Sequence, residues 1–466
     1  MKQTYNGWAN KVQGLLLLIL CMILFSCQKD FLDKKPDKSL LVPTTLKDFQ
    51  ALLDNTTIMN ASPSLNMIAS DEFYTTGDAL NSLGAIYEEN AYLWTKDDPY
   101  QGNRIVDWEL PYQQVFYANV VLEGLRKIPA DTYSQSQWNQ IKGSALFFRS
   151  FAFYNLAQEF AKPYIGSSAS TDLGIPLRLT SEVNAKSVRA TIQTTYDQII
   201  ADLNLAQSLL PLSANIKSRP SQMAVQALLS RIYLSMGDYV NAKKMADTYL
   251  SSNNKLIDYN TLTASGINPF PPAIPSGNDE VVFYSALIPI NFEYSSLTIV
   301  DSVLYRSFST NDLRKSLLFL DNGGGIINFI GDYTGLAYYN FGGLATDEVY
   351  LNRAECFARN NDGTSALKDL NLLLQNRYKK NAYTPISSTD MNVILSAILN
   401  ERKKELIARG TRWGDLRRLN QDSKYAITLK RIIYNQTYTL PPNDNRYVFP
   451  IPDNEITGSG IQQNPR

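Results

Sequence analysis

The sequence predicts an all-α fold of paired helices, and three observations support this prediction. Of the 466 residues, 44% are hydrophobic and 11% are aromatic, which is the composition of a globular protein with a large core. The stretch WNQIKGSALFFRSFAFYNLAQEF (138–160) is apolar on nearly every side from Ala145 onward, as is typical of a helix packed between other helices. Two later stretches, which begin at Leu229 and Ala354, share one spacing of large, turn and small residues.

The N-terminal residues predict a lipoprotein signal. Lys2 and Lys11 precede the apolar run LLLLILCMILF, whose 11 residues are too few to span a bilayer as a helix and fit the central part of a signal peptide. The run ends in LFSC, which resembles the bacterial lipobox, in which a small residue precedes the cysteine that is acylated. We therefore expect residues 1–26 to be removed, Cys27 to carry the lipid, and residues 27–40 to form a polar tether.

Charge and residue content exclude several classes of function. The 44 basic and 44 acidic residues cancel, so no net charge draws the chain to nucleic acid. Histidine is absent, which rules out a His-centred catalytic triad and a His-liganded zinc site. Once the signal is removed and Cys27 is acylated, Cys356 is the single free thiol, so no intramolecular disulfide is expected. We expect no cofactor, no bound metal and no nucleic-acid partner.

The two repeated stretches have the offsets of the tetratricopeptide helix-turn-helix pattern. The first has its large, turn and small residues at Leu229, Tyr233, 237–239, Ala242 and Ala246. The second has them at Ala354, Phe357, 361–363, Ala366 and Leu370. Small alanines on the second helix of each pair allow the first helix to approach closely. Further hairpins are expected at 111–160 and 192–210.

Residues 254–343 differ in their sequence pattern from the helical segments around them. The stretches GINPFPPAIPSGNDE, DNGGG and IGDYTG break any helical period. We therefore expect an irregular excursion from the helical frame. Binding surfaces tend to lie in such loops.

The stretch NERKKELIARGTRWGDLRRL (400–419) is predicted to be structural. One stripe at helical spacing consists of Leu395, Ile398, Leu399, Arg402 and Leu406. This stripe leaves Lys403 and Lys404 largely solvated. Two charge pairs along the helix are expected, Glu401 with Lys404 and Glu405 with Arg409. We expect Gly410 to end the helix in a left-handed conformation, Asp415 to cap the next helix, and Trp413 to fill the corner between them.

The same stretch resembles the signature near the C-terminus of the SusD/RagB family of Bacteroidetes outer-membrane lipoproteins. SCQKDFLDKKP is similar to the lipidated start of that family, and LGIPL to its post-helix loop. DEVYLNRAECFAR resembles its last tetratricopeptide helix, and YVFPIPDNEI followed by QQNPR resembles its ending. The family often ends in Gln-Asn-Pro-Gly-Tyr, whereas Arg466 follows Asn464-Pro465 here. The resemblance covers nearly the whole mature chain.

The resemblance implies about four tetratricopeptide hairpins within residues 41–466, which support a more variable, loop-rich half. It also implies a non-catalytic cell-surface lipoprotein that captures a nutrient, most often a glycan, for a SusC-like TonB-dependent transporter. Peptides or another nutrient are the alternative ligands, and a protein-interaction scaffold is the alternative role. A glycosidase would need two carboxylates about 5 to 10 Å apart across a cleft. Asp97-Asp98 and Glu88-Glu89 are adjacent carboxylates, which are usually solvated, so no enzyme is predicted.

The ligand-binding residues cannot be carried over from the family by motif, and they are predicted from the chain itself. Sugars bind to exposed aromatic faces that have amide and carboxylate groups nearby. The stretch NAYLWTKDDPYQGNR (90–104) offers Trp94 as a stacking platform, together with Tyr92, Asp97, Tyr100 and Asn103. A second candidate is Tyr294, in NFEYSS (291–296). Packing of these aromatics in the core is the alternative.

Overall fold

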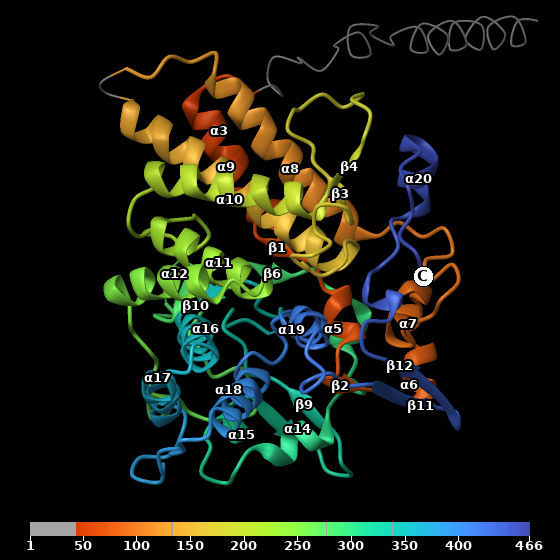
Figure 1. The fold of residues 1–466 in the computed structure, drawn as a ribbon, viewed down its shortest axis with the longest axis vertical. Helices are drawn as coiled ribbons and strands as arrows, with labels where there is room; N and C mark the ends of the chain where they lie inside the picture. Colours follow the sequence, from red (N-terminus) through yellow and green to blue (C-terminus); the bar gives the residue numbers. More distant parts are fainter. Residues whose placement is uncertain (1–42, 132–133, 276, 338) are drawn as a thin grey trace, which may run out of the picture. The chain divides into compact units, whose positions relative to one another are not determined.

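The computed structural model describes residues 43–131, 134–275, 277–337 and 339–466. The predicted signal peptide, Cys27 and the tether lie outside these residues. The chain from Thr45 to Arg466 forms one compact unit. This unit is rich in helix, as predicted, and none of its described helices is long and apolar enough to cross a membrane (Figure 1).

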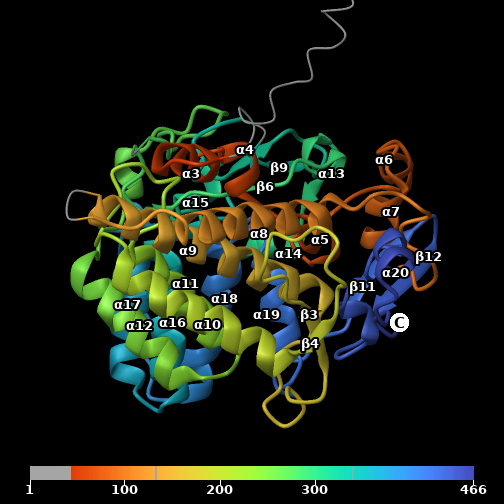
Figure 2. The same cartoon turned by 90° about the horizontal axis from the view of Figure 1, so that it is seen from above.

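Paired helices form the frame. Its helices are α8 (Val106–Leu125), α9 (Gln135–Phe160), α10 (Ile192–Leu209), α11 (Gln222–Ser235), α12 (Tyr239–Ser252), α16 (Thr346–Arg359), α17 (Gly363–Gln375) and α18 (Met391–Glu405). The predicted pairs α8–α9, α11–α12 and α16–α17 are confirmed, and α12 packs on α16 although a long insertion separates them in sequence. Figure 2 shows α8 and α9 side by side. The stretch 192–210 is the single helix α10, packed on α9, rather than a hairpin.

Local sequence explains where these helices begin and how closely they pack. The side chains of Ser221, Asp238 and Asp362 accept hydrogen bonds from main-chain N–H groups in the first turns of α11, α12 and α17. The small residues Ala242 and Ala366 are fully buried, as a close helix–helix approach requires. The hairpins can therefore be predicted from residues that are neighbours in sequence.

The described residues of the predicted excursion at 254–343 form short strands and one- or two-turn helices. These are η2 (Tyr259–Thr261), β5 (Val281–Phe283), β6 (Ala286–Leu287), α13 (Asn291–Tyr294), β7 (Ile299–Val300), α14 (Ser302–Ser307), α15 (Arg314–Leu317), β8 (Phe319–Asp321) and β9 (Ile327–Phe329). Strand β6 pairs in parallel with β1 (Ala61–Ser62) and β7 pairs antiparallel with β2 (Phe73–Tyr74), while β5 pairs with β10 (Leu344–Ala345). The excursion is therefore joined to the segment that precedes α8.

The remaining elements flank the frame. The segment before α8 holds α3 (Leu46–Leu53), α4 (Thr56–Met59), α5 (Leu65–Ala69), α6 (Gly77–Asn81) and α7 (Ile86–Tyr92). The hairpin strands β3 (Leu173–Pro176) and β4 (Arg189–Thr191) lie between α9 and α10 in sequence. The C-terminal part holds α19 (Arg412–Leu419), β11 (Leu429–Ile433), β12 (Gln436–Leu440), η3 (Asn445–Tyr447) and α20 (Asp453–Ser459). Strands β11 and β12 form a hairpin near α6 and α7 (Figure 1).

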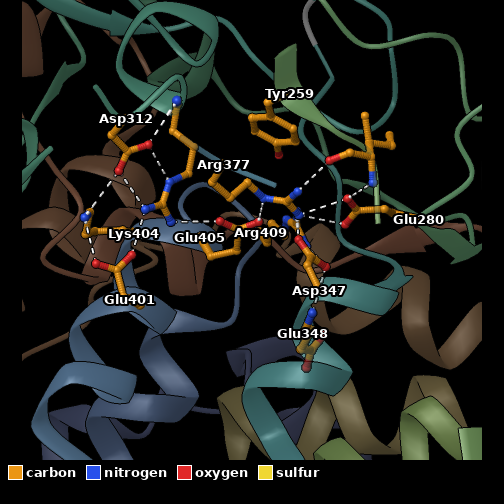
Figure 3. A network of polar contacts seen from close by, with 12 residues as sticks. Tyr259, Glu280, Asp312, Asp347, Glu348, Arg377, Glu401, Lys404, Glu405 and Arg409 are labelled. Atoms are coloured by element: carbon orange, nitrogen blue, oxygen red, sulfur yellow. Dashed lines mark hydrogen bonds and ion pairs between the residues drawn. The ribbon is translucent and has the colours of Figure 1, made fainter. Parts of the chain in front are cut away.

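A buried network of ion pairs holds the excursion on the helical frame (Figure 3). Glu405, at the end of α18, accepts hydrogen bonds from Arg314 of the excursion at 2.8 Å and from Arg377 at 2.6 Å. Arg377 also contacts both carboxylate oxygens of Glu280 at 2.9 Å. Arg314 also binds Asp312 at 2.7 Å. The side chains of Arg314, Asp312 and Glu405 are all buried. The excursion is thus fastened by charges that water does not screen.

The network corrects two expectations about the stretch 400–419. Lys403 and Lys404 were expected to be solvated, but Lys403 pairs with Asp71 at 2.8 Å and its side chain is only 23% exposed. Lys404 is buried, with its Nζ atom 2.8 Å from Glu401 and 3.5 Å from Asp312. The Glu401–Lys404 pair itself is confirmed. The Glu405–Arg409 pair is wrong, because Glu405 binds the two other arginines and Arg409 pairs with Asp347 at 2.6 Å. The excursion covers this face of α18, which helical spacing alone does not reveal.

The corner after α18 is built differently from the prediction, although its core residue is correct. Gly410 has the expected left-handed backbone, with a φ of 67°, but α18 already ends at Glu405. Helix α19 begins at Arg412, so Asp415 lies inside its first turn and does not cap it. Burial would raise the pKa of Asp415, but ion pairs with Arg402 and Arg418 lower it to about 2. Trp413 is 1% exposed and fills the corner, as expected.

Candidate functional site

A cleft of about 320 Å³ opens within the excursion, in the loop-rich part that the sequence marks as irregular. Its lining comes from α13 and the residues after it, from β9 and the residues after it, and from residues 266–268, 336–337 and 339–340. Met67 and Phe73 of the segment before α8 complete the lining. A cleft of this volume can hold a small ligand or part of a larger one.

The short helix α13, which carries Tyr294 into the cleft, is held by a carboxylate from α7. Glu88 is fully buried, and its two oxygens accept hydrogen bonds from the backbone N–H groups of Asn291 at 3.0 Å and Phe292 at 2.7 Å. These are the free N–H groups at the start of α13, where a carboxylate is favoured. Glu88 was expected to be solvated, and that expectation is wrong. Its role is to fix the helix that places Tyr294.

Asparagine side chains tie the other walls of the cleft together. Asn328 Nδ2 donates to the carbonyl oxygens of Ser296 at 2.9 Å and Thr298 at 3.0 Å, which joins β9 to the segment after α13. Asn268 Nδ2 donates to the carbonyl oxygen of Asp332 at 2.9 Å. The cleft is therefore formed by loops that are hydrogen-bonded to one another.

Aromatic and apolar side chains lie exposed in this cleft. Tyr294 and Tyr339 are each 44% exposed, and Ile267 and Leu336 expose their side chains next to amide and hydroxyl groups of the lining. Exposed aromatic faces beside hydrogen-bonding groups are the combination that sugar rings require. Tyr294 was the second candidate of the sequence prediction, and it lies in the cleft; its contact with a ligand stays a prediction.

The charged residues that line the described part of the cleft are both acidic, Glu293 and Asp332. Glu293 Oε1 accepts a hydrogen bond from the Asn340 N–H at 2.9 Å, while Oε2 is buried with no partner among the described residues. Burial, together with the nearby Asp332 carboxylate, raises the pKa of Glu293 to about 8. Burial raises the pKa of Asp332 to about 6. At neutral pH Glu293 is therefore mostly protonated and can donate a hydrogen bond, and Asp332 is mostly ionised.

The raised pKa of Glu293 predicts a pH-dependent difference in stability between the wild type and Glu293→Gln. The folded state retains a proton on Glu293 up to about pH 8, whereas an unfolded glutamate loses it near pH 4.3. Stability from this group is complete below pH 4 and is lost as the pH rises toward 8. Denaturant unfolding at pH 6, 7 and 8 should show the wild type losing up to about 1.4 kcal/mol per pH unit relative to Glu293→Gln. Parallel curves for the two proteins would contradict this assignment.

The first candidate platform is wrong, because its aromatic side chains belong to the core. Trp94 is 2% exposed, and its Nε1 donates to the Ala69 carbonyl oxygen at 2.9 Å. Tyr92 is also buried, and its hydroxyl accepts a hydrogen bond from the Thr75 N–H at 3.0 Å. The Arg431 guanidinium of β11 lies 3.6 Å from the centre of the Tyr92 ring and 4.4 Å from that of Trp94. These rings therefore offer no face to a ligand.

The other residues of that stretch also lie outside the cleft. Tyr100 is buried, and its hydroxyl donates to the Pro450 carbonyl oxygen at 2.9 Å. Asp97 and Asn103 are exposed, and Asn103 Nδ2 donates to the Tyr100 carbonyl oxygen. Neither residue lines the cleft around Tyr294. Conversely, the cleft is also lined by residues that the sequence prediction missed, namely Tyr339, Asn268 and Glu293. The only signal for them in the sequence is the lack of a helical period in 254–343.

Two other features limit the choice of site. A crevice beside Trp413 and Arg409 has a volume of about 60 Å³, which is too small for a sugar ring. Among the described residues, no group of three or more Cys, Asp or Glu side chains is arranged to hold a metal ion.

Comparison with protein families gives two matches. Residues 30–234 match a SusD-like family described as starch-binding and associating with the outer membrane. Residues 346–466 match the SusD family. Among curated proteins, SusD-like protein P2 of Formosa agariphila is 24% identical, in an alignment that covers 67% of this chain and 71% of that protein.

Solved structures share the fold over most of both chains. A putative sugar-binding protein from Bacteroides vulgatus has a TM-score of 0.72 and 21% identity, and the match covers 91% of this chain and 99% of that one. A SusD superfamily protein from Bacteroides thetaiotaomicron has a TM-score of 0.71 and 21% identity, with coverage of 91% and 100%. A laminarin-binding SusD-like protein has a TM-score of 0.65 and 18% identity, with coverage of 91% and 99%.

Proposed function

Because the chain belongs to the SusD/RagB family, we propose that it is a non-catalytic outer-membrane lipoprotein that binds a glycan and delivers it to a SusC-like TonB-dependent transporter. The observation that carries the glycan proposal is the cleft with exposed Tyr294 and Tyr339. The similar structures described as sugar-binding and laminarin-binding support it.

The cleft suits binding rather than bond cleavage. The faces of Tyr294 and Tyr339 can pack against the C–H faces of a sugar ring, and protonated Glu293 can donate to a ring or hydroxyl oxygen. Both carboxylate oxygens of Asp332 accept backbone N–H groups at 2.6 Å, from Thr334 and Phe341. Asp332 therefore holds the loop and is not free to pair with Glu293 as a catalytic acid and base.

Tyr294→Ala should weaken glycan binding by about tenfold, which corresponds to about 1.4 kcal/mol. Loss of one stacking face removes a large share of a weak affinity, and a half-exposed ring at the end of α13 supports little of the core. Calorimetric titration with laminarin oligosaccharides and other candidate glycans measures the affinity. Tyr434→Ala is the matched control, since Tyr434 is an exposed tyrosine on the β11–β12 turn.

The control should bind the glycan as the wild type does, and all three proteins should unfold at similar temperatures. If Tyr294→Ala binds as tightly as the wild type, the cleft is not the glycan site. If the wild type binds peptides and no glycan, the alternative ligand class applies. Sugar release from a polysaccharide by the wild type would contradict the non-catalytic role.

The proposal also places the protein on the membrane through a lipid on Cys27, which lies outside the described residues. Cys27→Ala should lose acyl labelling and leave the membrane fraction, because the apolar run before it is too short to span a bilayer. Fractionation with radiolabelled palmitate measures both effects. Retention of the label in Cys27→Ala would contradict the anchor.

A further inference from the structure

A second cleft of about 390 Å³ lies away from Tyr294, at the C-terminal part of the fold. It is bounded by the segment that follows α9, by the end of α19 and by the segment through η3. The polar residues that matter for its chemistry are Lys162, Asp172, Arg417, Asn420, Asp444 and Tyr447. Arg417, Asn420 and Tyr447 are each 3% exposed, so they form its inner surface.

Arg417 is a buried cation that makes no ion pair among the described residues. Its Nη2 donates to the Ala161 carbonyl oxygen, while Nε and Nη1 have no hydrogen-bond partner in the described part of the chain. Burial lowers the pKa of Arg417 to about 10, which still leaves it charged at neutral pH. A buried guanidinium without a counter-ion is costly, so the site favours the arrival of an anion.

The acidic residues near Arg417 do not supply this counter-ion. Glu159 is the carboxyl group close enough to Arg417 to affect its pKa. Its Oε1 accepts a hydrogen bond from the Asn66 N–H at 3.2 Å, and burial raises the pKa of Glu159. Burial thus favours the neutral form of Glu159. Asp172 and Asp444 line the cleft, and each already has a basic partner, Lys162 at 2.7 Å and Arg446 at 2.8 Å respectively.

Two neutral donors lie in the same inner surface. Asn420 Oδ1 accepts a hydrogen bond from the Ile427 N–H at 3.2 Å, and the buried Asn420 Nδ2 has no partner among the described residues other than the neighbouring Tyr447 hydroxyl. Burial raises the pKa of the Tyr447 hydroxyl, the neighbouring amide lowers it as a hydrogen-bonding neighbour does, and among the described residues the hydroxyl makes no other hydrogen bond. Arg417 of α19, Asn420 just after it and Tyr447 of η3 therefore bring a guanidinium group, an amide and a hydroxyl to the lining of one cleft. Buried polar groups are rarely left without a hydrogen-bond partner.

We propose that this second cleft binds an oxyanion, a carboxylate or sulfate group, with Arg417 as its counter-ion and Asn420 and Tyr447 as neutral donors. Carboxylate and sulfate oxygens accept charge-assisted hydrogen bonds from a guanidinium, and the remaining lone pairs fit the neutral donors. The group can belong to a free inorganic ion or to an acidic sugar. The cleft is separate from the Tyr294 site, so the two proposals can fail independently.

The test is to titrate the full mature chain with sodium sulfate and with sodium glucuronate. Calorimetry measures the binding, and thermal unfolding measures the change in unfolding temperature. Sodium chloride at equal ionic strength corrects for screening, and glucose serves as the neutral sugar. We expect a saturable rise in the unfolding temperature with at least one of the two oxyanions and none with glucose. A response to both identifies a general oxyanion site, and a response to glucuronate alone identifies an acidic sugar.

Three variants locate the effect. Arg417→Met keeps most of the apolar stem of the side chain, removes the guanidinium group and should abolish the saturable response. Tyr447→Phe removes only the hydroxyl and keeps the ring that packs on Trp413, with 4.8 Å between ring centres, so it should weaken binding roughly fivefold. Arg104→Met is the control: Arg104 lies outside this cleft, its side chain is 81% exposed, and the response should not change.

The proposal is overturned by either of two results. Without a saturable response to sulfate or glucuronate in the wild type, water satisfies these donors and the cleft is not an anion site. If Tyr447→Phe binds both anions as the wild type does, binding occurs elsewhere. This second result decides the matter even if Arg417→Met does not fold.

Discussion

Glu405→Ala is expected to lower the free energy of unfolding by about 3 to 5 kcal/mol. The carboxylate of Glu405 binds both Arg314 and Arg377, and its removal leaves two fully buried guanidinium groups short of an acceptor. Urea unfolding followed by circular dichroism measures the change.

Glu109→Ala is the matched control for that experiment. Glu109 also binds an arginine through two hydrogen bonds, but its partner Arg104 is exposed, so the free energy of unfolding should stay the same within error. Equal stability of Glu405→Ala and Glu109→Ala would mean that the buried network does not hold the excursion.

Trp413→Ala is expected to cost about 3 to 5 kcal/mol of unfolding free energy. The indole is buried in the corner between α18 and α19, and its ring centre lies 4.8 Å from that of Tyr447 and 5.9 Å from that of Phe449. Its Nε1 has no hydrogen-bond partner among the described residues, so the loss is one of packing.

Trp413→Phe tests this packing origin, because it keeps a ring and removes only the N–H and part of the volume. It should cost less than half as much as Trp413→Ala in the same urea titration. A loss of glycan binding in Trp413→Ala at unchanged stability would show instead that Trp413 contacts the ligand.

The helical frame could be predicted because its determinants are close in sequence. The turn and alanine spacings around Ala242 and Ala366 specify how two consecutive helices pack, and Asp238 and Asp362 act as N-caps within the same short stretches. Trp413 could be placed in the core for a similar reason, since a large apolar residue where two helices follow each other closely is usually buried at their junction.

The burial of Trp94 and Lys404 could not be predicted, because the residues that cover them come from distant parts of the chain. Arg431, which packs over Trp94, follows it by more than 300 residues. Asp312, which lies beside Lys404, belongs to the excursion. The spacing within a single helix or loop says nothing about such neighbours.

The candidate cleft was predicted in part. An exposed aromatic in an irregular segment was sufficient to name Tyr294. Glu88 positions α13 and one oxygen of Glu293 has no partner among the described residues, and both features depend on burial. Neither the pair Glu88-Glu89 nor the stretch NFEYSS indicates in the sequence that these side chains are buried.

The buried ion network also affects when the tertiary contacts of the excursion can form during synthesis. The acceptor of Arg314 on α18 lies 91 residues after it, and Arg377 lies 97 residues after Glu280. During synthesis the hairpins α8–α9 and α11–α12 emerge with their packing partners, whereas the excursion emerges before the carboxylates and guanidinium groups that secure it. A chain that stops before residue 400 therefore contains these hairpins and every residue that lines the Tyr294 cleft, but it lacks Glu401 and Glu405. The excursion that contains the candidate cleft therefore gains these buried ion pairs only after α18 has been synthesised.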